Sequence, residues 1–265
     1  IYHFNDVPRI EYALDGTAKG LLVEESRTNV FPYSNDPALW DIATTTATKN
    51  LTGPDNISNS AWTLEDDGST YELNRDRITI PADTNTHCVS FFVKKDNDET
   101  RFPEFQMGMT NSGYFYLKFN TKTGATYSRN NGLSGTHSVE NYGDWWRIVM
   151  VAANAGTSTD LDFTVLPAVA TTLEDSSVSV LTTGSIGFYG AQVELNASFP
   201  TSYIKTTGAT ATRSADVASI PVADFGYNQS EGTLFVEADT FSTSVNNHQD
   251  FNFFQGAVGG SSINS

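Results

Sequence analysis

The chain has 265 residues and a formal net charge of −16, with 31 acidic residues against 15 lysines and arginines. A surface of this charge repels phosphates and anionic lipids, so we expect neither nucleic acid nor membranes as partners. Residues 1–6 lack the features of a signal peptide, and no long apolar run predicts a membrane span. The single cysteine, Cys88, excludes an intrachain disulfide, and its apolar neighbours predict burial.

The elements predicted in chain order are almost all short strands. Residues 1–29 are expected to form an N-terminal arm. Residues 36–40 predict one helical turn with Asp36 as the cap and Pro37 in the first position, and Trp40 is expected to pack in the core. Apolar or alternating runs predict strands over residues 87–94, 105–109, 114–119, 145–151, 161–166 and 185–195.

This pattern of strands predicts the fold class and the division into domains. Many short strands, with no convincing amphipathic helix, predict an all-β antiparallel β-sandwich, with a jelly roll over residues 30–205 as the first choice. Residues 206–230 are polar and are expected to form a linker. Residues 231–265 begin a new strand pattern but are too short for an independent sandwich, so we expect them to be the truncated start of a second β-sandwich domain.

Two groups of short motifs bracket the predicted jelly roll. The lead-in motifs are residues 8–12 (PRIEY), 20–24 (GLLVE) and 27–29 (RTN), and the exit motifs are residues 190–194 (GAQVE), 200–204 (PTSYI) and 212–216 (TRSAD). They resemble the recurring lead-in and exit of phage and prophage tail or virion structural proteins, which enclose a carbohydrate-binding-module-like jelly roll. Residues 143–148 (GDWWRI) are similar to a late strand of that family, and residues 232–237 (GTLFVE) resemble the start of a lectin-like, concanavalin A-type domain.

The resemblance implies a location and a set of partners. It implies a virion tail or extracellular location, a polysaccharide as partner, and either a homo-oligomer such as a trimer or contacts with other virion proteins. It also implies a structural calcium near the points where the chain enters and leaves the jelly roll. Glu24, Asn29 and Glu194 lie near those points and are the candidate ligands, because calcium prefers several oxygen ligands.

The aromatic residues suggest a sugar-binding surface. Sugar sites combine aromatic rings with a few polar groups that fix the orientation of the ligand. Alternation places Tyr114, Tyr116 and Lys118 on one face of a strand, and Trp62 lies in a polar stretch. The candidate ligand-binding residues are Trp62, Tyr114, Tyr116, Lys118, Trp146 and Arg147. Structural roles remain open for them: tyrosines half-buried under a loop, tryptophans in the core, and an arginine paired with a buried carboxylate.

Catalytic signatures are weaker. Acidic clusters occur at residues 65–67 and 96–99, but neighbours in one turn do not place two carboxyl groups across a cleft, so we expect solvated turns or, alternatively, calcium binding. The sequence contains no zinc-type histidine pair, nucleophile elbow or phosphate loop, and no catalytic residue is predicted. The leading hypothesis is a non-catalytic carbohydrate-binding module of a phage tail or virion protein. The alternatives are a structural spacer or assembly module of a tail fibre, or part of a polysaccharide depolymerase.

Overall fold

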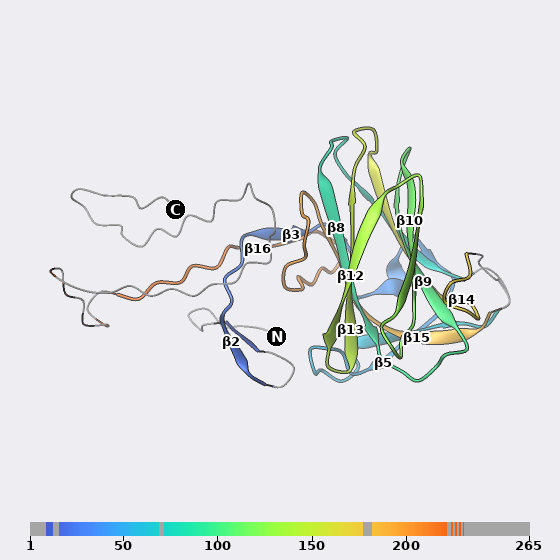
Figure 1. Cartoon of the computed structure of the whole chain (residues 1–265), viewed down its shortest axis with the longest axis horizontal. Helices are drawn as coiled ribbons and strands as arrows, with labels where there is room; N and C mark the ends of the chain where they lie inside the picture. Colours follow the sequence, from blue (N-terminus) through green and yellow to red (C-terminus); the bar gives the residue numbers. More distant parts are fainter. Residues whose placement is uncertain are drawn as a thin grey trace. The chain divides into compact units, whose positions relative to one another are not determined.

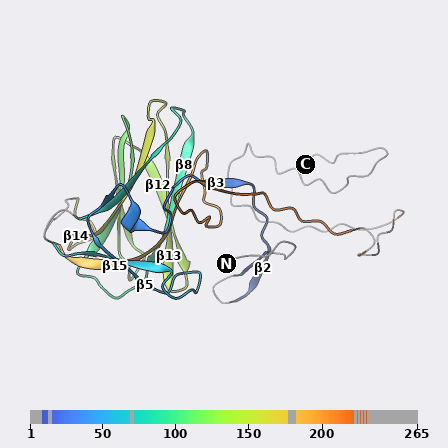
Figure 2. The same ribbon diagram turned by 180° about the vertical axis from the view of Figure 1, so that it is seen from behind.

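The computed structural model describes residues 9–12, 16–68, 72–176, 182–221, 224, 226, 228 and 230. The chain divides into two compact units, residues 1–225 and 226–265. All of the strands described below belong to the first unit, which is seen in Figure 1 and from behind in Figure 2. The expected second β domain at residues 231–265 lies outside the described residues.

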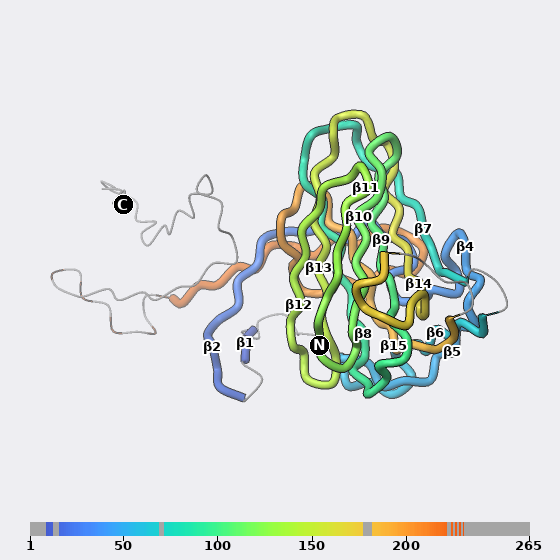
Figure 3. Tube along the Cα trace, turned by 45° about the vertical axis from the view of Figure 1, so that its right-hand side comes forward, coloured from blue at the N-terminus to red at the C-terminus, as the bar shows by residue number. Residues whose placement is uncertain are grey.

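The first unit contains an antiparallel β-sandwich, which confirms the predicted all-β fold class. Each of its two sheets has six strands. The first sheet contains, in spatial order, β11 (Thr126–Asn131), β10 (Gly113–Phe119), β9 (Phe102–Met109), β14 (Asp160–Ala170), β7 (Asn74–Thr79) and β4 (Ile42–Ala43). Figure 3 labels all six strands on the chain trace. The second sheet contains, in spatial order, β12 (Gly135–Tyr142), β13 (Trp145–Ala153), β8 (Thr86–Lys94), β15 (Gly184–Glu194), β6 (Ala61–Asp66) and β5 (Thr46–Leu51).

The chain crosses repeatedly between the two sheets. The second sheet contains the neighbouring strands β6, β15, β8 and β13, and the first contains β7, β14, β9 and β10. These two orders give the double Greek key of a jelly roll, in which the chain alternates between the sheets from β6 to β9 and again from β13 to β15. Every strand pairing within the described part of the sandwich is antiparallel. The arrangement encloses one core and leaves each sheet an outer face.

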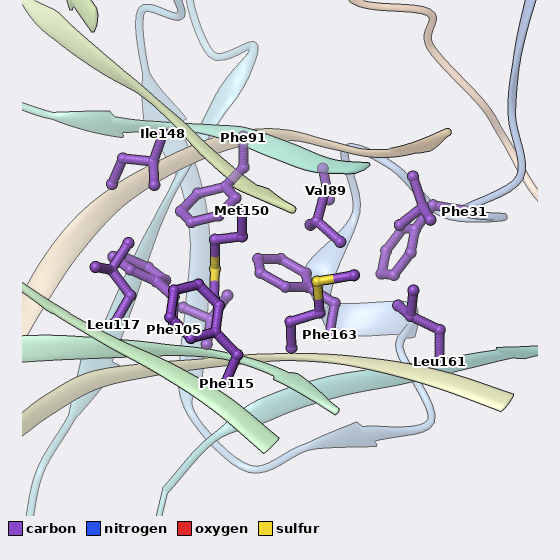
Figure 4. Close-up of a cluster of buried hydrophobic side chains, with 14 of the residues drawn as sticks. Phe31, Val89, Phe91, Phe105, Phe115, Leu117, Ile148, Met150, Leu161 and Phe163 are labelled. Carbon is purple, nitrogen blue, oxygen red and sulfur yellow. The ribbon is translucent and has the colours of Figure 1, made fainter. Parts of the chain in front are cut away.

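Side-chain alternation divides each strand between the core and the outer face. On β10, Phe115, Leu117 and Phe119 belong to the core. Figure 4 shows Phe115 and Leu117 among the core side chains. Phe91 of β8 meets Phe105 of β9 across the core, with ring centroids 4.5 Å apart. Full burial of such a side chain contributes about 1.5–3 kcal/mol relative to leaving it exposed. The core therefore fixes which side chains of β10 point outward.

The predicted strands correspond to β8, β9, β10, β13, β14 and β15. Cys88 lies within β8 and is buried, as predicted, and this burial raises the pKa of its thiol. No helix in the described part of the chain has the length and hydropathy of a membrane span.

The predicted helical turn is a short 3-10 helix, η1 (Pro37–Leu39). Asp36 occupies the cap position, although its side chain makes no capping hydrogen bond. Trp40 follows η1 and is 4% exposed, which confirms its predicted packing. Its ring lies edge-on to Phe31 at a centroid distance of 5.1 Å, and its Nε1 donates a hydrogen bond to the Tyr33 carbonyl at 2.9 Å.

The lead-in and exit motifs meet in space. Two small antiparallel sheets complete the unit: β1 (Ile10–Tyr12) with β2 (Ala18–Leu21), and β3 (Arg27–Asn29) with β16 (Ala211–Arg213). Figure 1 shows β3 and β16 side by side. The hydroxyls of Thr28 and Thr212, which are 184 residues apart in the sequence, lie 2.7 Å from each other. We call this pair of strands the ribbon.

An ion-pair network extends from the ribbon. Arg9 Nη1 donates to Asp216 Oδ2 at 2.8 Å, and Arg9 Nη2 donates to Glu24 and to the Ser202 hydroxyl. Glu24 also accepts a hydrogen bond from the Ser202 backbone N–H at 2.7 Å. Arg213 Nη1 lies 3.4 Å from Glu24. The network ties the chain before the sandwich to the chain after it.

The chain that follows β15 lies against the outer face of the second sheet. Arg147 of β13 donates from Nη2 to the Thr201 carbonyl. The ring of Tyr203 meets that of Tyr189, on β15, at a centroid distance of 5.3 Å. We call residues 199–206 the exit strap, since they cover outward-facing side chains of this sheet.

Candidate functional site

The two outer faces of the sandwich differ in what covers them. The exit strap contacts the outer face of the second sheet through Thr201 and Tyr203. The outer face of the first sheet instead carries aromatic, amide and charged side chains, because the apolar residues of its strands point into the core. The outer face of the first sheet is the candidate functional site.

Strand register arranges the outward-facing residues of the first sheet in three rows. The first row contains, from β11 to β7, Asn131, Tyr114, Gly108, Asp162 and Arg77. The second row contains Arg129, Tyr116, Gln106, Thr164 and Arg75. The third row contains Tyr127, Lys118, Glu104 and Leu166. Directly opposite residues have Cβ atoms about 4.5–5.5 Å apart, so each row is a line of contacting side chains.

Tyr114 and Tyr116 form what we call the tyrosine platform. Their ring centroids lie 5.7 Å apart, with 26° between the ring planes. Gly108 lies opposite Tyr114, and a Cβ atom there would be 2.5 Å from Tyr114 Cε1. The ring of Tyr114 therefore lies over the backbone of β9, in space that a larger residue would occupy. Two half-buried rings that are nearly parallel offer a flat apolar surface to a ligand.

A buried carboxylate supports the platform. Glu104 is fully buried and accepts a hydrogen bond from Gln106 Nε2 at 2.8 Å. Arg129 Nη2 lies 3.5 Å from the other oxygen of Glu104. The guanidinium carbon of Arg129 lies 3.8 Å from the centre of the Tyr116 ring, a cation–π contact that contributes about 0.5–2 kcal/mol. Glu104 thus positions Arg129, and Arg129 positions Tyr116.

A pocket of about 300 Å³ opens beside the platform. It is lined by Tyr114, by the turn at Thr110 and Asn111, and by the ion pair of Arg77 with Asp162. Arg77 Nε and Nη2 donate to the two carboxylate oxygens of Asp162 at 2.6 and 2.9 Å, and these bonds raise the pKa of Arg77. Since Arg77 is 48% exposed and Asp162 only 7%, the arginine presents its remaining donors to solvent. The pocket therefore combines an aromatic ring with charged hydrogen-bond donors.

Lys118 is covered by a loop, unlike its neighbours on β10. Its side chain is 1% exposed, and Nζ donates to the Asp175 carbonyl. Burial lowers the pKa of Lys118, and the negative charge of Glu104 opposes this effect. The segment around Asp175 thus covers the third row. In the first two rows the tyrosines, the arginines and Asn131 are exposed or half-exposed, whereas Gly108, Asp162, Gln106 and Thr164 are buried.

The other three candidate ligand residues lie elsewhere. Trp62 of β6 packs against the core and donates from Nε1 to the Asn35 carbonyl at 3.0 Å. Trp146 of β13 also packs against the core and donates to the Thr121 carbonyl at 2.8 Å. Arg147 binds the exit strap. Of the six candidates, the structure brings together the three on β10.

The three candidate calcium ligands have protein partners. Glu24 accepts hydrogen bonds from Arg9 and from a backbone N–H; burial favours its neutral form, but these bonds lower its pKa overall. Asn29 Oδ1 accepts from two backbone N–H groups, each at 3.0 Å. Glu194 accepts from the backbone N–H and hydroxyl of Thr201 at 3.0 and 2.6 Å. The described residues contain no group of three or more His, Cys, Asp and Glu side chains that could hold a metal ion, and a structural calcium remains a prediction.

The two acidic clusters have different surroundings. Asp96 pairs with the buried Arg101, whose Nε also lies 3.6 Å from Asp98. The expectation of a solvated turn is wrong for Asp66, which is 4% exposed at the end of β6. Burial raises the pKa of Asp66 to about 6, and the negative charge of Glu72 adds to this.

No sequence pattern predicted the side chains that surround the tyrosine platform. Glu104, Gln106, Arg129, Asp162 and Arg77 come from four different strands, and no motif links their positions in the sequence. One signal was present in β9, where polar residues alternate with phenylalanine and methionine. That alternation predicts a polar outer face on the strand next to β10.

No protein-family model matches the chain, and no curated protein matches its sequence. The chain is similar to CBM35 from Cellvibrio japonicus Abf62, with 10% identity, a TM-score of 0.33 and coverage of 65% of this chain and 99% of that one. It is also similar to the enzymatically active domain of tailspike protein 4 of bacteriophage CBA120, with 13% identity, a TM-score of 0.30 and coverage of 64% and 19%. A third structure, a "putative sugar binding protein" from Bacteroides thetaiotaomicron, gives 11% identity, a TM-score of 0.31 and coverage of 63% and 94%. Likeness of this degree leaves the function to be inferred from the residues of the chain itself.

Proposed function

We propose that the sandwich is a non-catalytic carbohydrate-binding module that binds a host or environmental polysaccharide on the outer face of the first sheet. The observation that carries the proposal is the tyrosine platform, set among hydrogen-bonding side chains in the first two rows. Aromatic rings contact the apolar faces of sugars, and amides, carboxylates and arginines bind their hydroxyls. The exposed side chains of Asn131 and Arg77 lie in the row of Tyr114, and the half-exposed side chains of Arg129 and Arg75 lie in the row of Tyr116. They supply those groups.

The exit strap supports the choice of face. On the second sheet, Arg147 and Tyr189 are already in contact with the strap. On the first sheet, Arg77 is about half exposed and lines a pocket together with Tyr114. A ligand would therefore meet available donors and an aromatic ring on the first sheet.

We further propose that the module belongs to a phage tail or virion protein and acts at the virion tail or in the extracellular medium. The support is the resemblance of the lead-in and exit motifs, which include Arg9, Glu24 and Asp216 of the ion-pair network. A homo-oligomer such as a trimer, contacts with other virion proteins and a structural calcium belong to the same proposal.

A glycan array followed by calorimetry tests carbohydrate binding. The wild-type protein is expected to bind at least one polysaccharide. Tyr114→Ala and Tyr116→Ala are each expected to weaken that binding about tenfold, because each removes one ring contact worth about 1.4 kcal/mol. Tyr12→Ala is the matched control, since Tyr12 is 61% exposed on β1, outside the first sheet. Thermal unfolding shows whether each variant is folded.

Two other results would overturn the proposal. If the folded wild-type protein binds no glycan, the module is a structural spacer or assembly module. If it releases reducing ends from the bound polysaccharide, it is part of a depolymerase.

A further inference from the structure

Basic side chains gather on the outer face of the first sheet, although the whole chain carries a net charge of −16. Register and alternation place seven charged strand residues on this face. The four basic residues are Arg75, Arg77, Lys118 and Arg129, and the three acidic residues are Glu104, Asp160 and Asp162. Lys118 is covered by the segment around Asp175, and Glu104 and Asp162 are buried. Of these seven residues, Arg75, Arg77, Arg129 and Asp160 therefore remain exposed or half-exposed, and three of the four are basic.

The acidic groups of the face already have partners. Glu104 accepts from Gln106 Nε2, and Asp162 accepts two hydrogen bonds from Arg77. Asp160 accepts from the Thr110 hydroxyl at 3.4 Å. These carboxylates therefore orient neighbouring side chains, and Asp162 keeps the guanidinium group of Arg77 on this face.

Two arginines keep unused donors. Among the described residues, the side chain of Arg75 has no hydrogen-bond or ion-pair partner. The Arg129 side chain is 28% exposed, and its Nη2 reaches Glu104 only at 3.5 Å. A guanidinium group presents planar donors that match the two oxygens of a carboxylate. Unused arginine donors beside an aromatic platform therefore favour a sugar that carries a carboxylate.

The two arginines lie far apart on one line. Arg129 on β11 and Arg75 on β7 are the ends of the second row, with Tyr116 and Gln106 between them. Four steps between neighbouring strands of about 4.8 Å separate these ends by about 19 Å. A single sugar ring does not span this distance, whereas several residues of an extended polymer do.

We infer that the ligand is an acidic polysaccharide that contains uronic acid residues and lies across the strands, along the second row. Its carboxylates bind Arg129 at one end and Arg75 at the other, and a sugar ring between them contacts the tyrosine platform. This inference rests on the proposed carbohydrate-binding function. Because the rest of the chain is strongly acidic, it repels polyanions, and an acidic polymer must be held by this face.

Calorimetry with paired polymers tests the inference. The probes are polygalacturonate, alginate and hyaluronan, each compared with its carboxyl-reduced form, and a set of neutral polysaccharides. We expect the wild-type protein to bind at least one acidic polymer, and carboxyl reduction to weaken that binding about tenfold or more, since hydrogen bonds to charged groups are involved. This comparison uses the unaltered protein.

Variants locate the effect on the protein. Arg75→Gln and Arg129→Gln are each expected to reduce affinity for the acidic polymer about tenfold, while affinity for its reduced form changes little. Lys205→Gln removes the same charge from an exposed position of the exit strap and is expected to leave affinity unchanged.

The outcomes separate the two proposals. If a neutral polymer binds as tightly as any acidic one, or if carboxyl reduction has no effect, the inference is wrong; the proposed function stands as long as Tyr114→Ala still weakens binding. If the folded protein binds neither acidic nor neutral polymers, both proposals are wrong.

Discussion

Replacing Asp76 by asparagine is expected to stabilise the sandwich above neutral pH. Asp76 lies on β7 and is 4% exposed. One of its oxygens accepts a hydrogen bond from the Arg77 backbone N–H at 3.0 Å, but Oδ2 is buried without a hydrogen-bond partner. Burial, together with the negative charge of Asp41, raises the pKa of Asp76 to about 6. The fold therefore favours the protonated form of this side chain.

The raised pKa of Asp76 determines how the stability of the fold changes with pH. The pKa of Asp76 is higher in the folded state than its ordinary value of 3.8, so the folded state binds the proton more tightly and loses stability as pH rises from about 4 to about 6. Ionising the buried group costs at most about 3 kcal/mol, at 1.36 kcal/mol for each pH unit. Asparagine has nearly the same shape and no charge. The gain in the free energy of unfolding should therefore grow from near zero at about pH 4 to about 2–3 kcal/mol at pH 8.

Urea unfolding of the wild type and Asp76→Asn, at about pH 4 and about pH 8, measures this gain. The two proteins are compared at the same pH because the acidic chain also repels itself as pH rises. Asp144→Asn, in an exposed turn, is the control and should change the free energy by about 0.5 kcal/mol or less. A variant that is less stable than the wild type at pH 8 would show that the ionised carboxylate is needed, which would refute the reasoning.

Two further predictions concern the site and the ribbon. Gly108→Ala places a methyl group 2.5 Å from Tyr114 Cε1, so the ring must move. We expect glycan affinity to fall about threefold to tenfold, and thermal unfolding to show a loss of stability of less than about 1 kcal/mol. Unchanged affinity would contradict the role of Tyr114. Arg9→Gln removes charged hydrogen bonds to Glu24 and Asp216, so we expect the ribbon to lose about 2–3 kcal/mol of protection in hydrogen exchange. If hydrogen exchange at the ribbon is the same in Arg9→Gln as in the wild type, the ion-pair network does not stabilise the ribbon.

The strands that the sequence revealed have a buried face made mainly of apolar residues. β8 and β10 are apolar or strictly alternating, so local pattern was sufficient to find them. The strand β11 (TYSRNN) was missed, because it lies at the edge of its sheet and no residue of it is fully buried. Such a strand is defined by its pairing with β10, which one sequence does not encode locally.

The same distinction applies to the candidate site. Alternation placed Tyr114 and Tyr116 together, since both belong to one strand. The position of Arg129 over Tyr116 depends on the register between β10 and β11. The burial of Lys118 depends on a loop in which the Asp175 carbonyl, 57 residues later in the chain, accepts a hydrogen bond from Nζ. Contacts of this kind require the folded chain, so the sequence predicted the platform without its surroundings.

The ribbon has a mechanical consequence. β3 and β16 are antiparallel, with Arg27 opposite Arg213 and Asn29 opposite Ala211. The incoming and outgoing segments therefore leave the ribbon at the same end, and tension between them separates the two strands one hydrogen-bonded pair at a time. Such a load opens the ribbon and the Arg9 network before it reaches the twelve strands of the sandwich. The rows of the candidate site thus keep their geometry while the chain that carries them is pulled.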